Sequence, residues 1–275
     1  MSALPLPAIQ HPPIGELRTW PGQVRPAQGE SVSSPKRLAR IAGLLYLINA
    51  VVAGFAYGFV ATEVYAAGDA ATTARNVLAN PGLVRLGVVA DLFQASEWIF
   101  LGMALYLLLQ HVNGNAARAM VVLVAVGAAI VCLNDVFEYV AVRVATDASY
   151  AAAFGAAGSN ALVLVLLELQ HYGFLIAQIF FGLWLMPLGY LAYRSGMFPR
   201  ALGVALVVAG LCYLADMLVL FLVPDFGKQV NAFLVIPPTI AETWMALYLL
   251  VKGVRLSPRD DRAPTVATGQ VSVAP

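Results

Sequence analysis

Six long apolar runs dominate the pattern of hydrophobic and polar positions along this 275-residue chain. Each is long enough to cross about 30 Å of hydrocarbon, which takes about 20 helical residues. The runs are continuous and do not alternate with a period of two, so they predict helices and not strands. We therefore expect an all-α fold, a polytopic bundle of six transmembrane helices, at roughly residues 38–61, 84–110, 117–142, 161–193, 201–223 and 232–251.

Shorter helical signals lie between these runs. In GDAATTARNVLANPG (residues 68–82), Asp69 or Thr72 can cap a helix that stops before Pro81. The segment TDASYAAAFGAAGS (146–159) predicts another short helix at the membrane interface. The fourth run is too long for a bare crossing, so its start is also expected at the outer interface.

Composition supports a membrane protein. Charged residues make up 11% of the chain and hydrophobic residues 60%, whereas about 25% of the residues of a soluble domain are charged. A soluble protein of this composition would lack the polar side chains to cover its surface. Cys132 and Cys212 both lie inside apolar runs, which favours free, buried thiols over a disulfide. A net charge of +1, with the basic residues spread over loops, predicts no nucleic-acid partner.

Lysine and arginine predict the orientation of the helices. With the N-terminus inside, 12 basic residues fall on the inner side and four on the outer side, so both termini are expected in the cytoplasm. The chain divides into a disordered cytoplasmic tail at 1–35, a transmembrane domain at 36–255 and a second disordered tail at 256–275, because both ends are polar and rich in proline. The outer four are Arg75, Arg85, Arg143 and Lys228.

Acids inside the apolar runs are the most informative feature. An Asp or Glu at a helix centre costs about 2.5–3.5 kcal/mol, so these groups must face the bundle interior or water. The spacing of Asp91, Gln94 and Glu97 puts them on one helix face, and so does that of Asp135 and Glu138. We expect an acidic cavity, open to the outside, that binds a cation or polar ligand; its candidate residues are Glu97, Glu242, Asp91, Asp135, Asp216, His171, Gln178 and Asn49.

A metal is the alternative occupant. Glu168-Leu-Gln-His171 has the Glu-x-x-His spacing of carboxylate-bridged metal bundles, and Asp135 is the third candidate ligand. The three histidines of the chain are too scattered for a three-His zinc site, because His11 lies in the tail and His111 at a helix end. Apart from this possible bound metal, no cofactor is expected.

Three other patterns carry expectations. Trp98 and Trp244 flank Glu97 and Glu242, so they favour either helix packing or a cage for an organic cation. Pro237-Pro238 predicts a break in the last helix, which would free backbone carbonyls for a ligand. Gly54 and Gly58 form a small-xxx-small pair that favours close helix packing.

Several segments resemble one bacterial integral-membrane family, known as domain of unknown function 4386. They are RLARIAGLLYLINAV (37–51), ALYLLLQHVN (104–113), YRSGMFPRALGVALVVAGLCYL (193–214) and PPTIAETWMALYLLVKG (237–253). The resemblance covers about residues 38–254 and implies a six-helix, multi-pass protein of the bacterial plasma (inner) membrane. It implies no activity, ligand or catalytic residue.

Three functions therefore remain open at this point. The first is binding or transport of a small cation, a proton, or a cationic or polar molecule through the acidic cavity. The second is an intramembrane enzyme that uses a metal held by carboxylates and histidine. The third is a structural or regulatory membrane subunit whose acids only join helices. The scarcity of histidine favours the first over the second.

Overall fold

The computed structural model describes residues 35–255, and the predicted tails lie outside these residues apart from Pro35. Within the described range every element is helical and no strand occurs, which confirms the all-α prediction. The elements are α1 (Pro35–Ala53), η1 (Gly54–Val60), α2 (Ala61–Val64), α3 (Ala70–Ala79), α4 (Pro81–Leu109), α5 (Gly114–Thr146), α6 (Ala148–Ser195), α7 (Arg200–Leu222), α8 (Pro224–Leu234), α9 (Ile236–Leu247) and η2 (Tyr248–Lys252). The two η elements are π-helical.

Six stretches are long and apolar enough to cross a membrane, as predicted. They are Pro35–Val64, Pro81–Leu109, Gly114–Thr146, Ala148–Ser195, Arg200–Leu222 and Pro224–Lys252. The fourth is a 48-residue helix that includes the predicted interface segment. Gly155 interrupts it with φ 72° and ψ 162°, a conformation that only glycine adopts readily, so the first turns form a separate arm.

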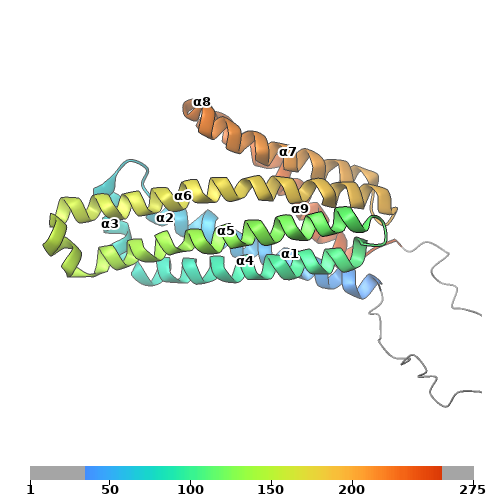
Figure 1. Ribbon diagram of the computed structural model, residues 1–275, viewed down its shortest axis with the longest axis horizontal. Helices are drawn as coiled ribbons and strands as arrows, with labels where there is room; N and C mark the ends of the chain where they lie inside the picture. Colours follow the sequence, from blue (N-terminus) through green and yellow to red (C-terminus); the bar gives the residue numbers. More distant parts are fainter. Residues whose placement is uncertain (1–34, 256–275) are drawn as a thin grey trace, which may run out of the picture. The chain divides into compact units, whose positions relative to one another are not determined.

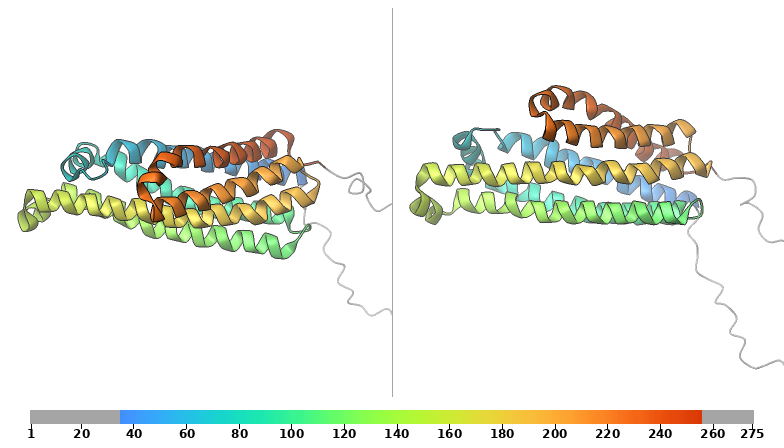
Figure 2. Two further views of the ribbon diagram at one scale, coloured as in Figure 1. Left: turned by 90° about the horizontal axis from the view of Figure 1, so that it is seen from above. Right: turned by 45° about the horizontal axis from the view of Figure 1, so that its top comes forward.

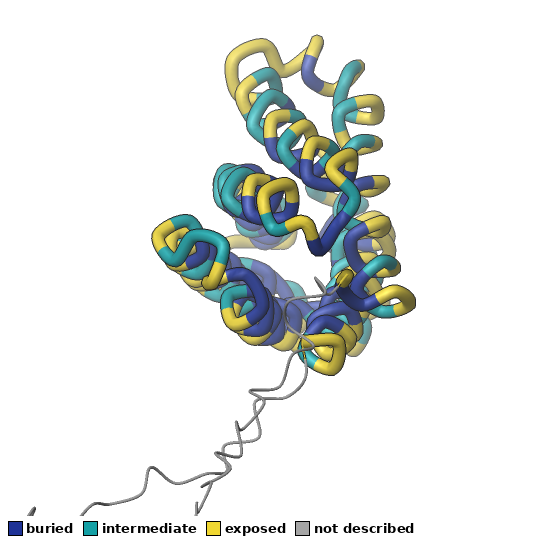
Figure 3. Tube along the Cα trace, turned by 90° about the vertical axis from the view of Figure 1, so that its right-hand side faces the viewer, coloured by how far each residue is buried: buried dark blue, intermediate teal, exposed yellow. Residues whose placement is uncertain are grey.

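The six stretches form a ring. Chain neighbours pack against each other in the order α1, α4, α5, α6 and α7, and α9 then packs against both α7 and α1. Figure 1 and the two views of Figure 2 show these helices lying side by side. Viewed along the helices in Figure 3, the buried faces turn towards the interior of the ring, while apolar residues remain exposed outside. Such an outer surface suits lipid contact.

A short helix closes one end of this ring, which we call the α3 end. Asp69 caps α3 as predicted, because its carboxylate accepts hydrogen bonds from the Thr72 amide at 2.9 Å and the Thr72 hydroxyl at 2.8 Å. These two bonds lower the pKa of Asp69 below its ordinary value. The helix stops at Ala79, before Pro81, and packs on α5 and α6.

Paired glycines bring α6 and α7 close together. A Cβ built on Gly182 would lie 2.7 Å from the carbonyl oxygen of Gly210, and one on Gly189 would lie 2.6 Å from that of Gly203. On each helix the two glycines are seven residues apart, which is the spacing expected where two helices pack along one continuous face. The predicted packing role of Gly54 is not seen, since neither it nor Gly58 has an atom of another element within 4 Å of its Cβ position.

The last membrane stretch is broken, as predicted, but the break lies at Val235. Pro237 and Pro238 occupy the first turn of α9, where a missing amide hydrogen costs nothing. The Thr239 hydroxyl donates to the Val235 carbonyl at 2.7 Å. This carbonyl is therefore already bonded, and the expectation of free carbonyl ligands does not hold there.

Two apolar clusters fill the ring, and three of its acids lie between them along the chain. On α4, Val84 belongs to the cluster at the α3 end and Ala95 to the larger cluster, with Asp91 between them. On α5, Val131 and Ala141 bracket Asp135 and Glu138 in the same way. These three acids therefore share one layer of the ring, whereas Glu97 lies between Ala95 and Trp98 of the larger cluster.

Candidate functional site

Glu242 on α9 is held by two tyrosines. The Tyr46 hydroxyl on α1 donates to its Oε2 at 2.8 Å, and the Tyr213 hydroxyl on α7 donates to its Oε1 at 3.0 Å. Both carboxylate oxygens are therefore oriented by neighbouring helices, and one acid joins α1, α7 and α9. A hydrogen bond to an ionised group contributes about 1.5–3 kcal/mol, so this arrangement offsets much of the cost of burying the acid.

Glu97 on α4 forms a second bonded group. The Asn49 amide on α1 donates to its Oε2 at 2.9 Å, and Gln94 donates to the Asn49 side-chain oxygen at 3.3 Å. The other oxygen of Glu97, Oε1, is buried with no partner in the described structure. Asp91, Gln94 and Glu97 are all buried, as their shared spacing predicts.

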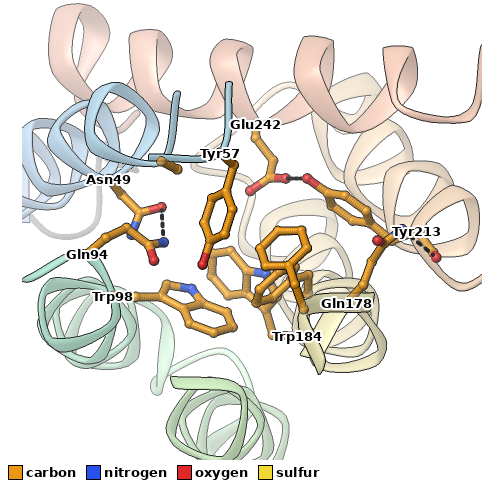
Figure 4. A pocket seen from close by; sticks show the side chains of 11 residues that line it. Asn49, Tyr57, Gln94, Trp98, Gln178, Trp184, Tyr213 and Glu242 are labelled. Carbon is orange, nitrogen blue, oxygen red and sulfur yellow. Dashed lines mark hydrogen bonds between the residues drawn. The ribbon is translucent and has the colours of Figure 1, made fainter. Parts of the chain in front are cut away.

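A cavity of about 140 Å³ lies among these groups (Figure 4). Helices α1, α4, α6, α7 and α9 and the π-helix η1 all contribute to its wall. The wall is mainly aromatic, with a carboxylate and three amide side chains set into it. The lining residues are Asn49, Ala53, Tyr57, Gln94, Trp98, Phe174, Gln178, Phe181, Trp184, Tyr213 and Glu242. We call this space the Glu242 cavity.

The aromatic rings of the wall pack edge to face. Trp98 meets Phe181 with ring centroids 5.2 Å apart at 75°, and meets Trp184 at 5.7 Å and 83°. This geometry is favourable between aromatic rings and holds them in place. The wall therefore presents rigid ring surfaces close to a fixed carboxylate.

Asp216 lies behind one side of this cavity and is fully occupied. Gln178 donates to its Oδ2 at 2.8 Å, and Asn231 on α8 donates to both carboxylate oxygens at 2.9 Å. Gln178 also bonds the Tyr213 carbonyl at 3.2 Å. These bonds join α6, α7 and α8. Asp216 therefore links helices, and neither of its carboxylate oxygens is free for a ligand.

Three further acids meet between α4 and α5. Asp91, Asp135 and Glu138 are all buried, and one oxygen from each lies within 4.8 Å of the others. At this separation two like charges repel by about 3 kcal/mol at an effective dielectric constant of 20. The three carboxyl groups therefore need either bound protons or a bound cation to relieve this repulsion. We call this group the acid triad.

Asn134, beside the triad on α5, has a different role. Its side-chain amide donates to the Gln170 carbonyl on α6 at 2.6 Å. Gly173 lies under this side chain, and a Cβ there would collide with the Asn134 amide oxygen. Asn134 is therefore a bridge between two helices, and Gly173 leaves the space for it.

A family model described as Domain of unknown function (DUF4386) matches residues 41–253. This chain belongs to that family. A curated relative from Archaeoglobus fulgidus, described as an uncharacterised protein, is 32% identical over 82 residues, which are 30% of this chain and 47% of the relative. The chain thus spans about half the length of the curated relative that it matches. No solved structure shows a significant match.

The predicted site residues of this DUF4386 chain fall into separate groups. Asn49, Gln178 and Glu242 line one cavity, Glu97 is bonded to Asn49, and Asp216 is bonded to Gln178. The structure thus divides the expected acidic cavity into the Glu242 cavity, an acid triad and a bonded aspartate.

The predicted metal ligands do not come together in the described part of this DUF4386 chain. Asp135 lies with Asp91 and Glu138, whereas His171 is exposed and stacks on Tyr65 with centroids 5.7 Å apart. Glu168 belongs to no group of acids and histidines close enough to share an ion. His171 shares a helix face with Gln178, but it lies about two turns closer to the α3 end, where it packs on Tyr65 and not on the acids of α4 and α5.

Sequence reasoning missed several residues of the Glu242 cavity. Tyr46 and Tyr213 bind Glu242, yet in an apolar run a tyrosine resembles an ordinary packing residue. Trp184, rather than Trp244, accompanies Trp98, because Trp244 is 38% exposed and lies outside the cavity. A search for tyrosines at the depth of the buried acids would have found the first two.

Proposed function

We propose that this membrane protein binds a small organic cation in the Glu242 cavity. The observation that carries the proposal is a carboxylate, fixed by two hydroxyl donors, that faces a space walled by aromatic rings. Ring faces attract a cation by about 0.5–2 kcal/mol each, most strongly where water is excluded. A negative charge beside them adds direct attraction for the same ligand.

The size and chemistry of the cavity favour an organic cation over a bare ion. Its volume of about 140 Å³ is close to the roughly 150 Å³ of an engineered protein cavity that accepts benzene. A calcium or magnesium ion takes six or more oxygen ligands at about 2.0–2.6 Å. Here both Glu242 oxygens already accept hydrogen bonds, and most of the wall is carbon. A quaternary or alkyl ammonium group suits that wall better.

We propose further that both termini face the cytoplasm of a bacterial plasma membrane. Eight basic residues of the described chain lie at the end of the ring that holds the start of α1 and the end of η2, and four lie at the α3 end. The eight are Lys36, Arg37, Arg40, Arg118, Arg194, Arg200, Lys252 and Arg255. An excess of Lys and Arg is typical of cytoplasmic loops. In this orientation the acid triad lies towards the outside.

Thermal unfolding of the purified protein in detergent tests the binding proposal. Tetramethylammonium chloride is the probe, tert-butanol is a neutral molecule of similar size, and sodium chloride controls for ionic strength. We expect a saturable rise in Tm with tetramethylammonium alone. At a hundredfold excess over Kd, a bound ligand stabilises the folded state by about 2.7 kcal/mol.

Two matched substitutions locate the effect. Glu242→Gln keeps the side-chain shape and removes the charge, so the rise in Tm should disappear. Glu168→Gln makes the same chemical change on a membrane helix outside the cavity and should leave the response intact. A full response in Glu242→Gln, or none in the unmodified protein, would overturn the proposal and leave the acids a helix-joining role.

A further inference from the structure

The acid triad is a second polar site, distinct from the Glu242 cavity. Asp91 comes from α4, while Asp135 and Glu138 come from adjacent turns of α5. Asp91 and Asp135 are each only 2% exposed. None of the three lines the Glu242 cavity. The triad therefore needs a neutralising partner of its own, whatever binds in the Glu242 cavity.

The hydrogen bonding of the triad is incomplete. Both oxygens of Asp135 and the Oδ1 of Asp91 are buried and have no hydrogen-bond partner in the described structure. The Tyr57 hydroxyl lies close to Asp91. No ion pair between described residues reaches any of the three acids. Buried carboxylates without partners are costly, so these oxygens favour a bound proton or cation.

The backbone at Gly87 leaves room for the side chain of Glu138. Gly87 on α4 faces the triad, and a Cβ at this position would lie 3.4 Å from the Oε1 of Glu138 and 2.9 Å from the Val60 side chain. A larger residue would press the glutamate towards the two aspartates. Opposite, η1 is a seven-residue π-helix that carries Tyr57 and Val60. Single π-turns within α-helices occur often at functional sites.

We propose that Asp91, Asp135 and Glu138 bind one divalent metal ion of the hard class: calcium, magnesium or manganese. The donors are all carboxylate oxygens, the ligands that these ions prefer, and no histidine or cysteine belongs to the group. Oxygens within 4.8 Å of one another can surround a single ion with bonds of about 2.0–2.6 Å. The ion offsets the repulsion of the acids and occupies the unpartnered oxygens of Asp135.

This assignment replaces the predicted Glu168 and His171 ligands by Asp91 and Glu138. The change of ligands alters the expected metal. A set with histidine suits zinc, iron or nickel, whereas three carboxylates suit calcium, magnesium or manganese. The inference does not depend on a ligand in the Glu242 cavity.

Manganese titration followed by electron paramagnetic resonance tests the inference. The detergent-purified protein is stripped with EDTA, and free Mn²⁺ is measured as the metal is added. We expect one saturable site per chain, with Ca²⁺ or Mg²⁺ competing for it. Asp135→Asn should weaken Mn²⁺ binding by at least about tenfold, because it removes the acid with two unpartnered oxygens.

Matched variants separate this site from the cavity. Glu138→Gln is the second test, used if Asp135→Asn does not fold, and it should also weaken binding. Glu242→Gln and Glu168→Gln remove a carboxylate elsewhere and should bind Mn²⁺ as the unmodified protein does. No saturable Mn²⁺ binding by the unmodified protein overturns the inference, and so does unchanged affinity in a folded Asp135→Asn variant. A metal site lost in Glu242→Gln instead would also overturn it.

Discussion

The two tyrosines that hold Glu242 allow a quantitative test of the cavity. Replacing Tyr46 or Tyr213 by phenylalanine removes one hydroxyl donor and leaves the ring in place. The ring of Tyr46 packs on Trp184 with centroids 5.9 Å apart, a contact that phenylalanine keeps. The change therefore isolates the hydrogen bond of 2.8 Å for Tyr46 or 3.0 Å for Tyr213.

The size of the loss depends on the charge of Glu242. A hydrogen bond to a charged group contributes about 1.5–3 kcal/mol, and one between neutral groups about 0.5–1.5 kcal/mol. We expect each single substitution to lower the free energy of unfolding by about 2 kcal/mol, the value for an ionised carboxylate. The double substitution should cost more than the sum, since it leaves the acid with no donor at all.

Equilibrium unfolding in mixed detergent, followed by circular dichroism, measures these losses. Tyr190→Phe is the matched control, because Tyr190 is 43% exposed on α6 and lies outside the cavity. Losses equal to that of the control for both Tyr46→Phe and Tyr213→Phe would refute the idea that they hold a charged acid. Losses near 1 kcal/mol would instead indicate a protonated Glu242.

Three other predictions follow from the structure. Gly210→Ala should destabilise the bundle by about 1–3 kcal/mol in the same unfolding assay, because its Cβ would lie 2.5 Å from the Gly182 carbonyl; Gly58→Ala, which meets nothing, should be neutral or stabilising. Asn134→Ala should cost about 0.5–1.5 kcal/mol by removing the hydrogen bond that joins α5 and α6, and a loss under about 0.5 kcal/mol would contradict its bridging role. The pKa of Asp69 is lowered in the folded chain, so its cap on α3 is intact above its ordinary pKa near 3.8. The cap is lost as the pH falls through the lower pKa of the folded chain. Hydrogen exchange of the Thr72 amide should then accelerate in the unmodified protein but not in Asp69→Asn.

The helices and their ends follow from local physical chemistry that a sequence displays directly. Apolar length fixes the six membrane stretches, and the Asp69 cap fixes the start of α3, because both depend on residues close together in the chain. The shared face of Asp91 and Glu97 also follows, since a helix has a known period. Such features require no knowledge of which helices are neighbours.

The grouping of the acids could not be predicted in this way. It depends on the rotation of each helix within the ring, and in lipid an apolar face gives little information because lipid and protein interiors are equally apolar. Glu168 and His171 have the spacing of metal ligands, but His171 packs on Tyr65, and the acids that meet lie on α4 and α5. Gly54 has the spacing of a packing glycine but faces open space, while the pairs that do pack are seven residues apart on α6 and α7.

Tyr57 connects the two polar sites and gives the arrangement a physical logic. Its ring lines the Glu242 cavity, and its hydroxyl lies close to Asp91 of the acid triad. It is carried by the π-helix η1, whose wider turn changes the register of α1 between Asn49, which serves the cavity, and the α3 end. A metal in the triad would hold Asp91 in place, and Asp91 would in turn fix the Tyr57 ring that forms one wall of the cavity. Tyr57 thus shapes the proposed organic-cation site and also responds directly to the charge of the acid triad.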